Sequence, residues 1–281
     1  MTIEWHLPLP PLQPFVEHML YIEGNNKGTG LPKTAMSLVF NLADHFRLFA
    51  NDRFEDCTHH KRFWVAGLQA APSYVESYGN SRMWVIQFWP LGAFAFFSEP
   101  LHLFSNAYTA LDDVYAAAAD RVWHQIGEAP SRKAQLQVIQ TFLQQRLLHG
   151  RSPAPSSLKR LHHVVKNMGS LSVESLCTEA GITRKHLNHL FQNYIGVSPK
   201  TQCSLFRFKR ILQRLSNSKP SSLTSFAYDE NFFDQAHFNN DFKRLSGLTP
   251  YNYLRQVEAW PSLKLVPHFY NAGKTKHSKL L

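Results

Sequence analysis

The chain has 281 residues, enough for two domains that each bury a core. Its net charge of +10 is uneven, because residues 1–155 hold 12 Lys and Arg against 13 Asp and Glu, whereas residues 156–259 hold 14 against 7. This surplus predicts a polyanionic partner for the second half alone. The three cysteines show no Cys-x-x-Cys spacing, and the sequence shows neither a signal peptide nor an apolar run of about 20 residues. These features argue against a secreted or membrane protein, so we expect a cytoplasmic protein with no membrane partner.

The first part of the chain is rich in predicted strands. Short apolar or alternating runs are separated by Gly, Pro, Asn and Asp, which is typical of strands and turns. The runs are Ser37–Leu42, Phe46–Ala50, Phe63–Ala66, Tyr74–Glu76 and Met83–Phe88. Their many large rings favour a small β-barrel or β-sandwich with an aromatic interior.

The apolar period then changes to that of helices, which we expect over Leu91–Phe97, Asp112–Ile126 and Arg132–Leu148. We therefore assign residues 1–150 to a mainly-β domain with helices. Gly, Pro and Ser dominate residues 151–157, which we interpret as a linker. Residues 158–258 are predicted to be all helical. The basic tail, residues 259–281, is expected to be disordered. The predicted fold class is α+β.

The second half repeats itself at an offset of 51 residues. Six positions of the first copy recur with the same or similar side chains in the second: His186, Asn188, Phe191, Gly196, Ser198 and Pro199 recur as His237, Asn239, Phe242, Gly247, Thr249 and Pro250. Such a repeat indicates two copies of one supersecondary unit.

Each copy has the pattern of a helix-turn-helix. In the first copy Ser172 and Thr183 are suited to cap two helices, and Gly181 stands where the first of them ends. In the second copy Ser222 and Asp234 take the capping positions, and Asn231 takes the place of Gly181, because Asn tolerates the left-handed conformation. The outward stripes of the two second helices carry no acid and are expected to face a DNA groove: Lys185, Asn188, His189 and Gln192 in the first, and Gln235, Ala236, Asn239, Asn240 and Lys243 in the second.

A long amphipathic helix over Pro199–Leu215 is predicted between the copies. Such a connector can set the spacing of two recognition helices, so that they enter major grooves about 34 Å apart. Four basic residues are suited to DNA phosphates: Arg184, Arg207, Arg210 and Lys243.

At these residues the second half resembles the AraC family of bacterial transcription regulators. The first matching stretch is Leu176-Cys177-x3-Gly181-Ile182-Thr183-Arg184-x2-Leu187-x2-Leu190-Phe191, followed by Gly196-Val197-Ser198-Pro199 and Arg207. The second is Ala227-x4-Phe232-x-Asp234-Gln235-x-His237-Phe238-x3-Phe242-Lys243-x3-Gly247-x2-Pro250-x3-Leu254-Arg255. The resemblance implies two helix-turn-helix units joined by a linker helix, and base-reading roles for Lys185, Asn188, His189, Gln235, His237, Asn239 and Asn240.

Four positions depart from the family pattern. Cys177 replaces the usual Ala, Asn231 the usual Gly and Ile211 a usual Ala, while Arg214 stands at a usually apolar position. The first half resembles, more weakly, the amino-terminal domains of some less characterised members of the family. This match rests on Phe40-Asn41-Leu42, Gly67-Leu68-Gln69, Phe88-x-Pro90-Leu91-Gly92-Ala93 and Leu111-Asp112-Asp113.

The resemblance implies a sequence-specific transcription regulator that binds double-stranded DNA and RNA polymerase. Its residues 1–150 are expected to sense a small-molecule effector or to form a homodimer, with no effector pocket assigned by the sequence. The alternative is an enzyme or metal-binding barrel fused to a DNA-binding domain. His45, Cys57, His59 and His60 are metal-ligand types. Adjacent histidines beside basic residues are usually solvated, and neither a Gly-x-Ser-x-Gly elbow nor a phosphate loop is present. We therefore expect no metal, no cofactor and no catalysis.

Overall fold

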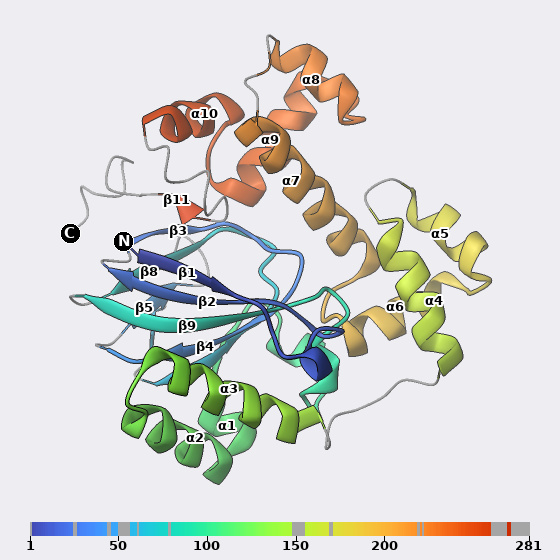
Figure 1. The fold of residues 1–281 in the computed structure, drawn as a ribbon. Helices are drawn as coiled ribbons and strands as arrows, with labels where there is room; N and C mark the ends of the chain where they lie inside the picture. The colour runs from blue at the N-terminus through green and yellow to red at the C-terminus, as the bar shows by residue number, and fades with distance from the viewer. Residues whose placement is uncertain are drawn as a thin grey trace.

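The computed structural model describes residues 2–24, 27–43, 46–49, 57–60, 62–77, 80–147, 155–168, 171–217, 220, 222–259 and 269–270. Figure 1 shows a β-rich first half with helices on one side, and a second half built from helices. The predicted α+β class, with a mainly-β first domain and an all-helical second one, is confirmed.

Two antiparallel sheets form the first half. The six-stranded sheet has the order β1 (Thr2–His6), β2 (Val16–Gly24), β9 (Ser81–Phe88), β4 (Ser37–Asn41), β7 (Phe63–Ala66) and β10 (Tyr108–Ala110). The other has the order β11 (Phe269–Tyr270), β3 (Lys27–Gly30), β8 (Ser73–Ser77), β5 (Phe46–Phe49) and β6 (Cys57–His60). The five predicted strands are all confirmed as β4, β5, β7, β8 and β9, whereas β1, β2, β3, β6, β10 and β11 were not predicted.

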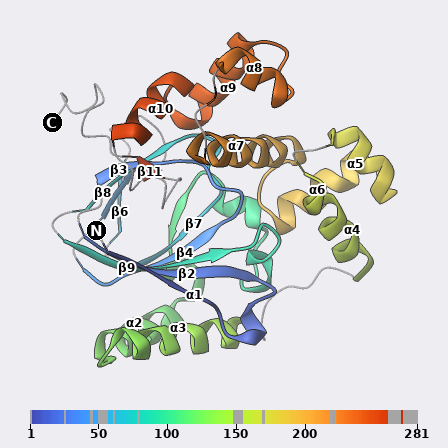
Figure 2. The ribbon, with the colours of Figure 1, turned by 45° about the horizontal axis from the view of Figure 1, so that its top comes forward.

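Both faces of the six-stranded sheet are buried. Along β2, Met19 and Tyr21 belong to the main core, whereas Leu20 and Ile22 belong to a second cluster that also holds Phe46 of the other sheet. The main-core face is covered by α1 (Leu111–Tyr115), α2 (Ala117–Glu128) and α3 (Arg132–Leu147) (Figures 1 and 2). A strand buried on both faces does not alternate between apolar and polar side chains, and for this reason β2 was not predicted from the sequence.

Two of the predicted helices are wrong in detail. Leu91–Phe97 contains only a 3-10 turn, η2 (Ala93–Ala95), and Asp112–Ile126 is broken into α1 and α2. The break lies at Ala116, whose φ of 43° is incompatible with a continuous right-handed helix. The third predicted helix is confirmed as α3.

The second half contains α4 (Pro155–Lys166), α5 (Val173–Ala180), α6 (Arg184–Tyr194), α7 (Pro199–Asn217), α8 (Leu223–Asp229), α9 (Gln235–Ser246) and α10 (Pro250–Ala259). The first turn of α4 lies within the predicted linker 151–157. In the tail predicted to be disordered, Phe269 and Tyr270 pair with Gly30 and Thr29 of β3.

Candidate DNA-binding interface

The first helix-turn-helix unit consists of α5 and α6. The Ser172 hydroxyl accepts a hydrogen bond from the Ser175 amide, and that of Thr183 accepts one from the His186 amide, so both caps are as predicted. Gly181 has a φ of 61° and ends α5 in the left-handed conformation. The next residue, Ile182, donates its amide to the Cys177 carbonyl at 3.1 Å and packs against the core.

The second unit, α8 and α9, is built in the same way. Ser222 caps α8 through the Ser225 amide, and Asp234 caps α9 through the His237 amide. Asn231 has a φ of 60°, as predicted from its correspondence with Gly181. Phe232 then donates its amide to the Ala227 carbonyl at 3.0 Å, as Ile182 does in the first unit.

The turns of the two units differ in length by one residue. From the first cap to the turn, the units correspond at an offset of 50, since Ser172, Gly181 and Ile182 match Ser222, Asn231 and Phe232. The recognition helices correspond at 51. The repeat predicted at an offset of 51 residues, which starts at His186 in the second helix, is consistent with this correspondence. The extra residue is Phe233, between the turn and the cap of α9.

The predicted base-reading residues of the first unit all lie at the surface. Lys185, Asn188 and His189 are exposed on α6, opposite the buried Leu187, Leu190 and Phe191. The side chains are exposed in the presence of the first half of the chain, so the first half does not cover this face of α6.

The corresponding residues of the second unit divide into two groups. His237 and Asn240 are exposed on α9, whereas Gln235 and Asn239 are half-buried. Gln235 accepts a hydrogen bond from the Thr224 hydroxyl of α8 at 2.6 Å, which orients its amide. The Oδ1 atom of Asn239 is buried without a hydrogen-bond partner. In this conformation Asn240 therefore offers its full amide to a partner, and Asn239 only part of it.

The four residues predicted to contact phosphate lie in different settings. Lys243 and Arg184 are exposed, although Arg184 also pairs with Glu174 at 3.2 Å. The guanidinium of Arg207 lies 5.3 Å from the centre of the Phe232 ring. Arg210 donates to the Glu230 carboxylate at 2.9 Å and is thus engaged within the chain.

Glu230 links the connector helix to the second unit. Its side chain is 1% exposed and accepts hydrogen bonds from Arg210 Nε and from Arg214 Nη1, the latter at 2.5 Å. The hydrogen bond to Glu230 raises the pKa of Arg214 above its ordinary value. Arg214, which departs from the family pattern, therefore has a partner, and Ile211 is buried in the core.

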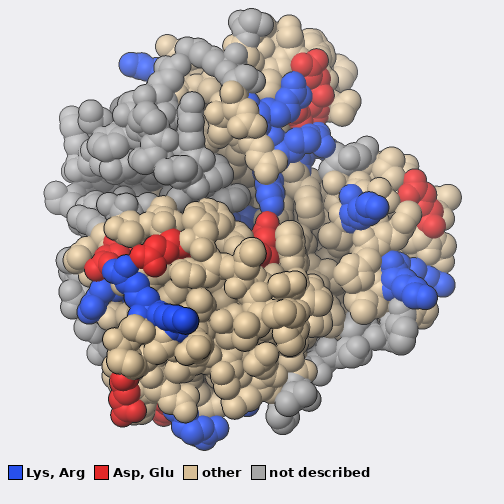
Figure 3. Space-filling model, viewed as in Figure 1, with Lys and Arg blue, Asp and Glu red and all other residues tan. Residues whose placement is uncertain are grey.

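The basic side chains form separate groups on the face shown in Figure 3. Blue groups lie over α4 to α7, and red acidic groups lie beside them near α5 and α8. Arg184 pairs with Glu174 of α5, and Arg214 of α7 pairs with Asp229 of α8. The exposed stripes of α6 and α9 contain Lys185 and Lys243 and no acid.

The first unit and the connector helix pack on the N-terminal half. The rings of Tyr194 on α6 and Phe94 on η2 are 5.7 Å apart, and the Ser105 hydroxyl donates to the Gly196 carbonyl. From α7, Gln202 Nε2 donates to the Thr34 carbonyl at 2.6 Å, and Lys209 Nζ lies 3.9 Å from Glu17 Oε1. The core is continuous across this boundary.

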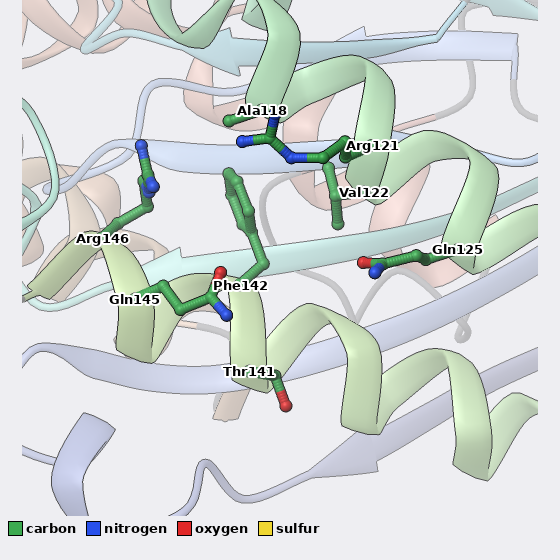
Figure 4. A pocket seen from close by; sticks show the side chains of 8 residues that line it. All are labelled: Ala118, Arg121, Val122, Gln125, Thr141, Phe142, Gln145 and Arg146. Atoms are coloured by element: carbon green, nitrogen blue, oxygen red, sulfur yellow. The ribbon is translucent and has the colours of Figure 1, made fainter.

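The rings expected inside the β-domain fill its core. Phe46 and Trp64 lie between the sheets, while Phe40 contacts Phe142 of α3, and Trp84 donates to Gln135 of α3 at 3.2 Å. Trp89, also expected inside, is an exception, because it is 42% exposed. A pocket of about 190 Å³ lies between α2 and α3, where Arg121 and Arg146 flank Phe142 (Figure 4).

Four residues of types that can bind metals have side chains outside the part of the chain that the structure describes: His45, Cys57, His59 and His60. Among the side chains that it does describe, no three His, Cys, Asp or Glu group together as metal ligands would. None of the described helices combines the length and apolar character needed to span a bilayer.

Comparison with known proteins identifies two segments. Residues 176–256 match the model of a helix-turn-helix domain, and residues 4–110 match that of a domain of unknown function, DUF6597. The HTH-type transcriptional regulator GlxA of Rhizobium meliloti (strain 1021) is 35% identical over 71 residues, which are 25% of this chain and 22% of that protein. The raffinose operon transcriptional regulatory protein RafR of Pediococcus pentosaceus is 30% identical over 86 residues, 31% of each chain. The matches thus span under a third of these relatives.

Solved structures extend the comparison to more of the chain. ToxT from Vibrio cholerae covers 84% of this chain and 98% of its own, with 11% identity and a TM-score of 0.48. The AraC-like transcriptional activator CuxR covers 75% of this chain and 86% of its own, with 14% identity and a TM-score of 0.30. The matched model and the two capped units agree that residues 176–256 form a helix-turn-helix domain, which is similar in sequence to parts of the transcription regulators GlxA and RafR.

Proposed function

We propose that this protein is a sequence-specific transcription regulator that binds double-stranded DNA through α6 and α9. The observation that carries this proposal is the pair of capped recognition helices, each with an acid-free exposed stripe, on one connector helix. With 19 residues, α7 is about 28 Å long and connects the two helix-turn-helix units. Two units in one chain can therefore read an asymmetric site.

We propose further that the N-terminal half controls how the first unit meets DNA, in response to a small effector or to pairing with a second subunit. The support is the direct packing of α6 and α7 on that half through Tyr194, Gly196, Gln202 and Lys209. A change in the packing around Phe94, Ser105 or Thr34 would move these contacts. RNA polymerase is the proposed further partner, and the cytoplasm the proposed location.

The first test is binding of the full-length protein to fluorescent duplexes at several salt concentrations. The logarithm of the affinity should fall linearly with the logarithm of the salt concentration, with a slope of about −2 to −4 for two to four phosphate contacts. Selection from a random duplex pool should then yield one enriched asymmetric sequence. If no duplex binds, or if binding is independent of salt, the protein does not act on DNA in this way.

A further inference from the structure

The additional residue in the second turn is an aromatic side chain in an unusual position. Phe233 is 85% exposed, and its neighbour Phe232 is 4% exposed. The ring of Phe232 lies 5.2 Å from that of Phe238 and fills the place that Ile182 occupies in the first unit. The core of the second unit is therefore complete without Phe233.

Phe233 immediately precedes the N-terminus of the recognition helix. The next residue, Asp234, is the cap of α9, and Gln235 begins that helix. In helix-turn-helix proteins the N-terminal residues of the recognition helix contact base edges. Ala236, also exposed, lies in the same first turn of α9. An exposed Phe and an exposed Ala thus stand where side chains meet bases.

We propose that Phe233, together with Ala236, recognises the 5-methyl group of thymine in the half-site of the second unit. Thymine is the base that presents a methyl group in the major groove, and Phe and Ala are side chains that contact it. The first unit has no residue that corresponds to Phe233, and it has Lys185 where Ala236 stands in α9. The two units would accordingly differ in specificity, with methyl recognition confined to the second. This inference rests on the proposed DNA-binding function and names the chemistry of one of its contacts.

The test uses the full-length protein and the duplex that it selects from a random pool. Each thymine of the selected sequence is replaced singly by deoxyuridine, which removes the methyl group and keeps base pairing. For the unaltered protein, one or two replacements should weaken binding about fourfold, the factor expected for one buried methyl group. In Phe233→Ala the same replacements should have a clearly smaller effect, because only the small side chain of Ala236 keeps its contact, and binding to the intact duplex should already be weakened.

Tyr228→Ala is the matched control, because Tyr228 is a 57% exposed aromatic residue of α8, outside the recognition helix. It should leave the response to deoxyuridine unchanged. Thermal unfolding by circular dichroism should show that both variants remain folded, as expected for exposed side chains. The inference is overturned if no thymine is sensitive to methyl removal, or if Phe233→Ala shows the same sensitivity as the unaltered protein. Failure to select any sequence would instead refute the proposed function.

Discussion

At the scale of single residues, the two recognition helices divide their polar side chains between exposed and half-buried positions. Asn188 and Asn240 are exposed, whereas Asn239 has a buried carbonyl oxygen without a partner. An exposed amide can make two hydrogen bonds to adenine at once, which a half-buried one cannot do without moving. The contribution to specificity should therefore be largest at Asn188 and Asn240.

Asn188→Ala and Asn240→Ala should each cost about 1–3 kcal/mol of binding free energy on the selected duplex and little on unrelated DNA. Fluorescence anisotropy titrations with both duplexes measure the difference. Asn252→Ala is the control, since Asn252 is an exposed Asn of α10, outside the recognition helices. Equal losses on the two duplexes would mean that these amides do not read bases.

At the scale of elements, the orientation of the second unit on α7 depends on a buried charge. Arg210 and Arg214 of α7 hold the Glu230 carboxylate at the end of α8. A buried carboxylate is stable when its lone pairs are satisfied, and removing it leaves donors without their partner.

Glu230→Gln should lower the free energy of unfolding by about 1–3 kcal/mol, because the guanidinium groups lose their anionic acceptor. Urea denaturation provides the measurement. Asp229→Asn is the matched control: Asp229 is 63% exposed and pairs with the same Arg214 at 3.4 Å, so its loss should cost about 0–1 kcal/mol. Similar effects of the two changes would show that burial of Glu230 contributes nothing.

At the scale of the whole molecule, the two halves share one core, and Gly196 lies at their boundary. Gly196 has a φ of 109°, and a Cβ atom there would lie 3.0 Å from the Leu101 carbonyl oxygen and 3.1 Å from Ser105 Oγ. Gly181 also has a positive φ, of 61°, but a Cβ atom there would meet nothing within 4 Å. Substitution of these two glycines by Ala therefore distinguishes the effect of backbone strain, present at both, from the effect of disturbing the contact between the halves, present only at Gly196.

Gly181→Ala should cost about 1–2 kcal/mol of stability through strain alone. Gly196→Ala should lower the free energy of unfolding by more than Gly181→Ala does. It should also make the two halves unfold at different urea concentrations, because the new methyl group would clash with η3 (Leu101–Phe104) at their boundary. Tryptophan fluorescence reports on the first half, which holds five of the six Trp, and far-ultraviolet circular dichroism on the helices. If the two probes give coincident urea transitions in Gly196→Ala, the boundary does not depend on this contact.

A second prediction for the whole molecule concerns pH. Burial of His18 on β2, followed by the charges of Lys33 and of Lys209 from α7, lowers the pKa of His18 to about 4. The ring of Trp5 lies 4.7 Å from that of His18, and Glu17 pairs with the same Lys209 at 3.9 Å. Because the unfolded chain binds a proton near pH 6.5 and the folded one does not, stability should fall as the pH drops from about 6.5 to about 4.

Denaturant titrations between pH 7 and pH 4 check this dependence, with His18→Gln as the variant that lacks the titrating group. The variant should show a shallower loss of stability over that interval. An unchanged slope would assign the acid sensitivity to other groups.

The sequence by itself determined the parts of this protein that depend on local chemistry. Ser172, Thr183, Ser222 and Asp234 cap their helices as predicted, and Asn231 takes the left-handed conformation that the repeat required, because caps and turns are set by a few neighbouring residues. The helix periods and the repeated units followed for the same reason.

Only the tertiary structure decided what depends on distant residues. The strand β2 is buried on both faces by segments far away in the chain, so its pattern carries no period of two. Likewise, the partners of Arg210 and the burial of Asn239 come from packing between helices. The exposure of Phe233 was also decided by packing, because Phe232 beside it occupies the core position.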